Sequence, residues 1–134
     1  MVRQYLLDTN TASYIIKGNI PAVRRRLLQV RMAQVGVSTV TEGELRYGVA
    51  RRQGATQLQK IVEEFLLRVT IVPWDSGAAG QYGYLRADLE RLGQPMGNLD
   101  IMIGAQALSL DAILVSNDRA FSRIKKLKVE DWTI

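Results

Sequence analysis

The chain has 134 residues, 47% of them hydrophobic, which is enough for one domain with a sizeable core and leaves little room for a second. Eighteen Lys and Arg residues against thirteen Asp and Glu residues give a formal charge of +5, which suits a polyanionic partner such as nucleic acid. The lack of Cys and His excludes disulfides, thiol nucleophiles, Cys-ligated zinc and the usual general base, so any chemistry must rest on carboxylates.

The sequence has no sign of a membrane segment. The N-terminal stretch reaches Asp8 without the apolar core of a signal peptide, and no uncharged run approaches the length that spans a bilayer. We therefore expect a soluble, cytoplasmic protein without membrane contact.

The first predicted element is a buried strand at Tyr5–Leu7, which is followed at once by Asp8. Three apolar residues in a row are typical of a strand that helices cover on both faces. Because open parallel sheets bind ligands outside the carboxyl ends of their strands, Asp8 would lie at a ligand site. Taken alone, Asp8-Thr9-Asn10 could also be only turn and cap chemistry, with Thr9 or Asn10 capping the next helix.

Turn residues and hydrophobic spacing divide the rest of the chain into short strands and helices. In chain order, the predicted elements are helices at Thr11–Lys17 and from Pro21 to about Val30, a strand at Val35–Ser38, a helix from Thr41 or Ser38 to about Arg51, a helix at Ala55–Leu67, a strand at Val69–Pro73, helices at Ser76–Leu92 and Ile101–Leu110, a strand at Ala112–Val115, a helix at Arg119–Leu127 and an edge strand at Val129–Trp132. This alternation predicts an α/β fold with a central parallel sheet of four or five short strands and helices on both faces, in one domain over residues 1–134.

Two acids lie close together on the helix that ends near Arg51. At about 100° per residue, Glu42 and Glu44 point to nearly opposite sides, so only one of them can face a given pocket. Both could instead be acids of the first turn that the helix dipole favours.

Two further acids lie where predicted elements meet. Gly93–Asp100 is a helix-breaking segment that delivers Asp100 to the start of an almost wholly apolar, and therefore buried, helix. Alone, Asp100 could be only the N-cap of that helix. The strand at Ala112–Val115 ends in Ser116-Asn117-Asp118, which repeats the opening pattern. With Glu44, these acids are hard to explain as independent caps, and their natural meeting point is the carboxyl edge of the sheet.

The order and spacing of these pieces resemble the PIN-domain nucleases, in particular the VapC toxins of bacterial and archaeal toxin–antitoxin pairs. The resemblance covers essentially the whole chain and rests on Leu7–Asn10, Ser38–Thr41 with Glu44–Gly48, Gly93–Asp100, Val115–Asp118 and Glu130–Trp132. Matched position by position, it implies an acidic quartet of Asp8, Glu44, Asp100 and Asp118, with Asn10 and Ser116 as polar supports.

The resemblance implies a metal-dependent endoribonuclease that cleaves RNA, such as tRNA or another translation RNA, and thereby inhibits translation. Oxygen-only ligands suit one or two Mg²⁺ or Mn²⁺ ions, and four close carboxylates would repel one another unless cations neutralise them. We expect Asp8 and Asp100 to be the principal ligands, with Glu44 a ligand or water-orienting base and Asp118 a second-metal or outer-shell ligand. The residues expected to hold the RNA backbone are Arg119, Arg123, Lys125 and Lys126.

The resemblance also implies a homodimer and a VapB-type antitoxin whose C-terminal tail blocks the site. Such a tail could lie between the helices at 11–30 and the helix at 41–51, with a basic residue reaching the acids. Two alternatives stay open. One is an aspartyl-phosphate-type phosphotransfer domain, although haloacid-type phosphatases want a second acid where Asn10 stands. The other is a catalytically degenerate RNA-binding or scaffold domain, which a quartet member outside the cleft would favour.

Overall fold

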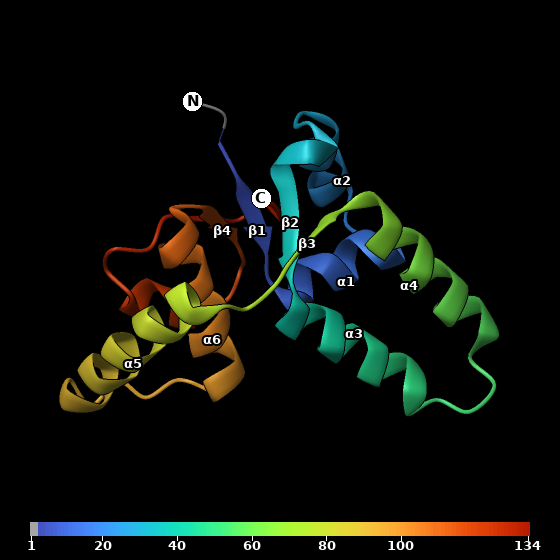
Figure 1. Ribbon diagram of the computed structural model, residues 1–134. Helices are drawn as coiled ribbons and strands as arrows, with labels where there is room; N and C mark the ends of the chain where they lie inside the picture. Colours follow the sequence, from blue (N-terminus) through green and yellow to red (C-terminus); the bar gives the residue numbers. More distant parts are fainter. Residues whose placement is uncertain (1–2) are drawn as a thin grey trace.

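A parallel sheet lies between two groups of helices in the computed structural model, which describes residues 3–134 (Figure 1). Within that range the sheet has five strands in the spatial order β3-β2-β1-β4-β5, and each neighbouring pair is parallel. The strands are β1 (Tyr5–Leu7), β2 (Val35–Ser38), β3 (Thr70–Val72), β4 (Ile113–Val115) and β5 (Val129–Glu130). Since β1 is the middle strand, Asp8 follows the centre of the sheet at its carboxyl edge.

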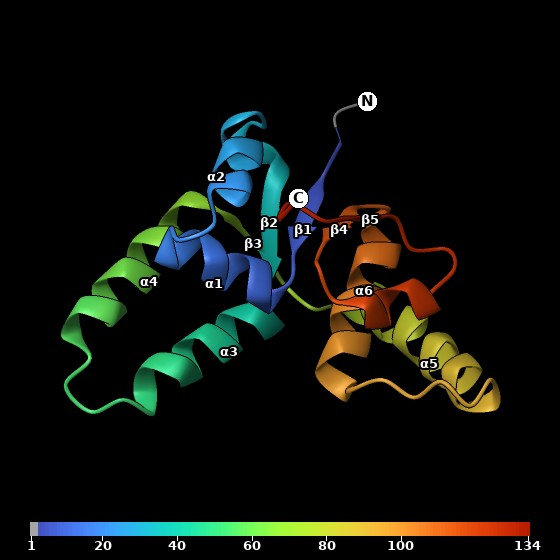
Figure 2. The same cartoon turned by 180° about the vertical axis from the view of Figure 1, so that it is seen from behind.

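The helices cover both faces of this sheet, as two opposite views show (Figures 1 and 2). On one side lie α1 (Thr9–Lys17), α2 (Pro21–Leu28), α3 (Thr39–Ala50) and α4 (Thr56–Arg68), and on the other lie α5 (Ser76–Arg91) and α6 (Asn98–Leu110). Two short 3-10 helices, η1 (Met32–Gln34) and η2 (Arg119–Arg123), complete the described elements. The predicted α/β class and central parallel sheet are confirmed. No helix within residues 3–134 is long and apolar enough to cross a membrane.

The central strand is buried on both faces, as its unbroken apolar run predicts. Tyr5 and Leu7 belong to the core beneath α1 to α4, whereas Leu6 belongs to the core beneath α6 and η2. Leu6 is 1% exposed and Leu7 is 0% exposed. Strand alternation sends neighbouring side chains to opposite faces, so a strand with a core on each face needs an apolar residue at every position.

The predicted helix at Arg119–Leu127 is wrong, because only η2 forms and the chain then turns. Phe121 and Ile124 are both buried against α6, and a spacing of three residues matches the period of a 3-10 helix. The N–H groups of Ile124 and Leu127 accordingly donate to carbonyls three residues earlier. The Leu114 N–H donates to the carbonyl of Lys128 at 2.8 Å, so the chain must already be extended there. This leaves no length for further helical turns.

The last strand is also shorter than predicted, because Trp132 leaves the sheet edge and enters the core. Trp132 is 1% exposed, and its ring packs on Tyr5 with 5.5 Å between ring centroids. Its Nε1–H donates to Glu130 Oε1 at 3.1 Å, and the guanidinium of Arg26 lies 5.7 Å from the ring centroid. Trp132 thus fastens the end of the described chain to β1 and α2.

Trp132→Ala is expected to lower the free energy of unfolding by about 3–5 kcal/mol, because it removes a large buried ring. Urea denaturation measures this change. Ile134, which is 91% exposed, gives a control two residues away. Ile134→Ala should change the free energy of unfolding by less than about 0.5 kcal/mol. Equal effects of the two substitutions would contradict the packing of Trp132.

Candidate active site

Asp8 is held at the carboxyl edge of β1 by contacts to both of its carboxylate oxygens. It is 4% exposed and caps α1 itself, a role expected of Thr9 or Asn10, with Oδ1 accepting from the Thr11 N–H at 2.8 Å. Its Oδ2 accepts from the hydroxyl of Ser116 at 2.6 Å. Ser116 Oγ in turn accepts from the Asp118 N–H at 3.0 Å. The segment after β4 therefore fixes the carboxylate that follows β1.

Glu44 faces this edge, and Glu42 does not. Of the two predicted caps for α3, Ser38 is the one used, so α3 begins at Thr39. Thr9 Oγ1 donates to Glu44 Oε1 at 2.6 Å. Glu42 instead pairs with Arg46, at 3.1 Å between Oε2 and Nη2. The prediction that only one of the two acids faces a given pocket is confirmed, and the helical spacing is the reason.

Asp100 lies within electrostatic reach of the other three acids. Burial raises its pKa above the ordinary value of 3.8, and the negative charges of Asp118, Asp8 and Glu44 raise the pKa further. Asp100 is not the N-cap of α6, because Gly97 holds that position and Asp100 lies in the first turn. Asp118 caps η2 by accepting from the Ala120 N–H at 2.9 Å. The structure therefore brings the predicted quartet together at one edge of the sheet.

Asp100→Asn should stabilise the metal-free protein at neutral pH. A raised folded-state pKa means that the folded chain binds this proton more tightly than the unfolded chain does. The stability that protonated Asp100 contributes is therefore lost as the pH rises from 3.8 through the raised pKa of the folded state. Above that pKa the contribution is absent. Thermal melting in chelator measures this. The melting temperature of Asp100→Asn should exceed that of the wild type at pH 7, and the difference should close below pH 3.8. A difference that does not change with pH would point to packing instead.

The donor set of this edge fits a hard divalent cation. Within residues 3–134, no group of three or more His, Cys, Asp or Glu side chains is already arranged to hold a metal ion. Mg²⁺ does not require three protein ligands, since it keeps several waters and commonly binds through one or two carboxylates. Each carboxylate offers about four lone-pair sites, so the two hydrogen bonds of Asp8 leave it able to bind a metal. A cation would also relieve the repulsion that raises the pKa of Asp100.

The other predicted site residues lie near this edge or beyond it. Asn10 is exposed on α1, and Arg119, Arg123, Lys125 and Lys126 are exposed in η2 or just after it. Arg123 Nη1 donates to the carbonyl of Pro95 at 2.8 Å, so this side chain also braces the segment before α6.

Some neighbours of the acids were missed from the sequence. Thr9 contacts Glu44 directly, and Thr41 contacts Thr9 at 3.1 Å between hydroxyl oxygens. The position of Thr41, three residues before Glu44 on the same helix face, was an available signal. A cavity of about 180 Å³ beside Glu44 is lined by Lys17, Arg51 and Arg52, among others. The positions of Lys17, Arg51 and Arg52 in the sequence do not predict that these residues line one cavity.

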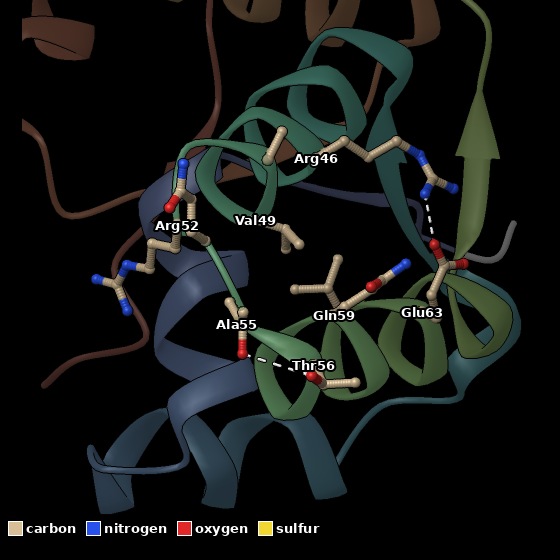
Figure 3. Close-up of a pocket in the computed structure, with 11 residues that line it drawn as sticks. Arg46, Val49, Arg52, Ala55, Thr56, Gln59 and Glu63 are labelled. Carbon is tan, nitrogen blue, oxygen red and sulfur yellow. Dashed lines mark hydrogen bonds and ion pairs between the residues drawn. The ribbon is translucent and has the colours of Figure 1, made fainter.

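A second cavity lies between α3 and α4 and contains none of the four acids (Figure 3). Its volume is about 490 Å³. The guanidinium of Arg46 at its wall is paired with Glu63, at 2.6 Å between Nη1 and Oε1, and with Glu42. The charge of Arg46 is thus neutralised, and the cavity contains none of the carboxylates that lie at the edge of the sheet.

The family model described as PIN domain matches residues 5–127, and the chain belongs to the PIN-domain family. PIN-domain nucleases generally depend on divalent metal. The chain is 36% identical over 131 residues to "tRNA(fMet)-specific endonuclease VapC" of Shigella flexneri, covering 97% of this chain and 98% of that protein. The relatives that match over nearly the full length are VapC ribonucleases, so the resemblance seen in the sequence is confirmed.

Solved structures agree with this assignment. A chain in the crystal structure of DNA-bound VapBC from Salmonella typhimurium is 34% identical, with a TM-score of 0.91, and the match covers 98% of this chain and 99% of that one. For VapBC2 from Rickettsia felis, bound to a DNA fragment from its promoter, the identity is 32% and the TM-score 0.87, over 97% of this chain and 98% of that chain.

The PIN fold disfavours the phosphotransfer alternative. A catalytically degenerate scaffold would be favoured if one of the four acids lay outside the cleft. The four acids instead lie near the same edge of the sheet.

Proposed function

We propose that the chain is the toxin of a toxin–antitoxin pair, a divalent-metal-dependent endoribonuclease that cleaves RNA and thereby inhibits translation. The observation that carries the proposal is the position of four acids near the carboxyl edge of the sheet. Ser116 links Asp8 to the backbone of Asp118, and Thr9, the residue after Asp8, contacts Glu44. The charges of these three acids add to burial in raising the pKa of Asp100. Relatives named as VapC endonuclease or ribonuclease support the reaction class. Because one of them is named for tRNA(fMet), we take tRNA or another translation RNA as the substrate class and the cytoplasm as the place of action.

Each acid has a proposed role. Asp8 and Asp100 are the principal ligands of Mg²⁺ or Mn²⁺, and Asp118 binds a second ion or lies in the outer shell. Glu44 is a ligand or orients the attacking water. A bound divalent ion lowers the pKa of its water and stabilises charge on the phosphate. Ser116 keeps Asp8 in place through its hydroxyl, and Asn10 is a further polar support.

The substrate is held by positive charge outside the acidic edge. We assign the RNA backbone to Arg119, Arg123, Lys125 and Lys126, which are exposed in or just after η2. The segment that carries them begins directly after Asp118, so phosphates bound there would lie close to the proposed metal site. The formal charge of +5 favours association with a polyanion in general.

The proposed partner is a VapB-type antitoxin whose C-terminal tail occupies the helical side of the site. The similar chains in the VapBC structures from Rickettsia felis and Salmonella typhimurium support this partner. Beside Glu44 lies the cavity of about 180 Å³ between α1, α3 and α4. A more apolar cavity of about 430 Å³, with Ile15, Leu27 and Phe65 in its wall, lies between α1, α2 and α4. An amphipathic tail helix suits such a surface. We also propose a homodimer, which sedimentation of the isolated chain would test.

The purified chain should cut RNA in Mg²⁺ or Mn²⁺ and stop when a chelator is added, because the proposed site works only with metal. Gel analysis of an end-labelled tRNA pool before and after chelation measures this. Restoring excess Mg²⁺ to the chelated sample should restore cleavage, which controls for damage to the protein. Unchanged cleavage in excess chelator would rule the mechanism out.

A further inference from the structure

Three side chains from α1 and α3 form a continuous hydrogen-bonded chain that ends on Glu44. Thr9, the first residue of α1, has its Oγ1 at 2.6 Å from Glu44 Oε1 and at 3.1 Å from Thr41 Oγ1. Thr41 is 0% exposed. Thr41 and Glu44 lie three residues apart on α3, so they share the helix face that meets α1.

The chemistry of the three groups fixes the direction of these bonds. An ionised carboxylate can only accept, so the single hydroxyl proton of Thr9 is donated to Glu44. Thr9 Oγ1 then has lone pairs left but no proton. The contact with Thr41 must therefore be a bond in which Thr41 donates to Thr9. Thr41 therefore donates to Thr9, and Thr9 donates to Glu44. The first donor, the hydroxyl of Thr41, belongs to a buried residue.

We infer that Thr9 is a positioning residue that holds Glu44 in the conformation needed for metal binding, and that Thr41 keeps Thr9 oriented for this role. A glutamate side chain loses conformational entropy when a metal ion fixes its rotamer. If a hydrogen bond already holds the side chain in that rotamer, less entropy is lost when the metal binds. The inference rests on the proposed function, because it gives Glu44 a place in the metal site.

The same turn of the chain thereby fixes two acids. Asp8 accepts from the backbone N–H of Thr11 and from Ser116, while the next residue, Thr9, reaches across to α3. The β1–α1 junction sets the position of Asp8 and Glu44 relative to each other. The alternative is that the Thr9 hydroxyl only holds α1 and α3 together. Removal of the hydroxyl would then lower the stability of the fold but leave the affinity for metal unchanged.

The test is the binding of Mn²⁺ to the full chain, measured without turnover by the loss of the free-ion electron paramagnetic resonance signal. Thr9→Val keeps the shape of the side chain and removes the hydroxyl. We expect Mn²⁺ affinity to fall by about 10–100-fold, the usual effect of losing a group that orients a metal ligand. Thr9→Ser keeps the hydroxyl and should bind Mn²⁺ within a few-fold of the wild type. Thr41→Val should weaken binding in the same direction but less.

Thr56→Val is the matched control, because Thr56 is also the first residue of a helix and its exposed hydroxyl donates to the Gly54 carbonyl, at 3.4 Å, far from the four acids in the sequence. This variant should bind Mn²⁺ as the wild type does. In a cleavage assay, Thr9→Val should raise the Mg²⁺ concentration that gives half-maximal rate more than it lowers the rate at saturating Mg²⁺. Wild-type Mn²⁺ affinity in Thr9→Val, with or without a lower melting temperature, would overturn the inference and leave the nuclease assignment standing. A wild-type chain that binds no Mn²⁺ would overturn both.

Discussion

Asp8→Asn is expected to abolish RNA cleavage while it leaves the fold intact. The substitution keeps the size of the side chain and removes the charge that a metal ion requires. If the metal supplies several kcal/mol of charge stabilisation in the transition state, its loss slows cleavage by at least about 1000-fold, since 1.36 kcal/mol is tenfold. A cleavage assay with purified variants in Mg²⁺ measures the change.

The structure explains why this variant should still fold. Asn caps helices about as well as Asp, so the bond from the Thr11 N–H to the side-chain oxygen can remain. The amide NH2 then replaces Oδ2 and can donate to the hydroxyl oxygen of Ser116. Removal of one negative charge should also lower the pKa of Asp100, because Asp8 is among the charges that raise it. The melting temperature in chelator should therefore not fall.

Asp111→Asn is the matched control for charge removal. Asp111 lies before β4, at the opposite end of that strand from Ser116, and has a φ of 51°, a conformation that Asn adopts readily. Cleavage by Asp111→Asn should equal that of the wild type. If Asp8→Asn still cut RNA at more than about a tenth of the wild-type rate, Asp8 could not be a principal metal ligand.

The second large effect concerns the antitoxin. Without metal the edge is an uncompensated cluster of carboxylates, whereas the whole chain carries +5. A good inhibitor should therefore present a basic group to the acids and acidic or apolar surface around it. Expression of the chain should arrest growth, and coexpression of the cognate antitoxin should restore it. Deletion of the antitoxin's tail should remove the rescue, and charge reversal of the tail's basic residue should weaken it.

The control for this experiment is the inactive variant. Asp8→Asn expressed with the tail-less antitoxin should not arrest growth, which would show that the arrest comes from cleavage and not from the burden of expression. A tail-less antitoxin that bound and inhibited as well as the full protein would disprove the blocking mechanism. The nuclease assignment would survive that result.

The sequence predicted the central strand of this fold and the position of Asp8 at its end, because burial determines both. Leu6 and Leu7 face two different cores, and only an uninterrupted apolar run can satisfy both faces. The sequence leaves Asp8-Thr9-Asn10 open as turn and cap chemistry, with Thr9 or Asn10 as the cap, or as part of a ligand site. Asp8 itself caps α1 through Oδ1, and its Oδ2 accepts from the hydroxyl of Ser116. The two interpretations are compatible, since one carboxylate has enough lone pairs for several partners.

What the sequence did not predict depends on tertiary contacts. The bond from Thr9 to Glu44 requires α1 and α3 to pack together, and no local pattern encodes that packing. The helix expected after Asp118 does not extend beyond η2, because the chain is already beside β4 at Lys128, whose carbonyl accepts from the Leu114 N–H. Gly97, rather than Asp100, is the N-cap of α6, so the helix begins at Asn98 and Asp100 lies within its first turn.

The position of a bound metal ion tests the central claim most directly. Crystals of the chain grown with Mn²⁺ and measured at the manganese absorption edge would show the ion by its anomalous signal. The ion should lie at the carboxyl edge of β1, bound by Asp8 and Asp100, with Glu44 and Asp118 bound or reaching it through water. Mn²⁺ bound only elsewhere, such as between Glu42 and Glu63, or no Mn²⁺ at saturating concentration, would contradict the account.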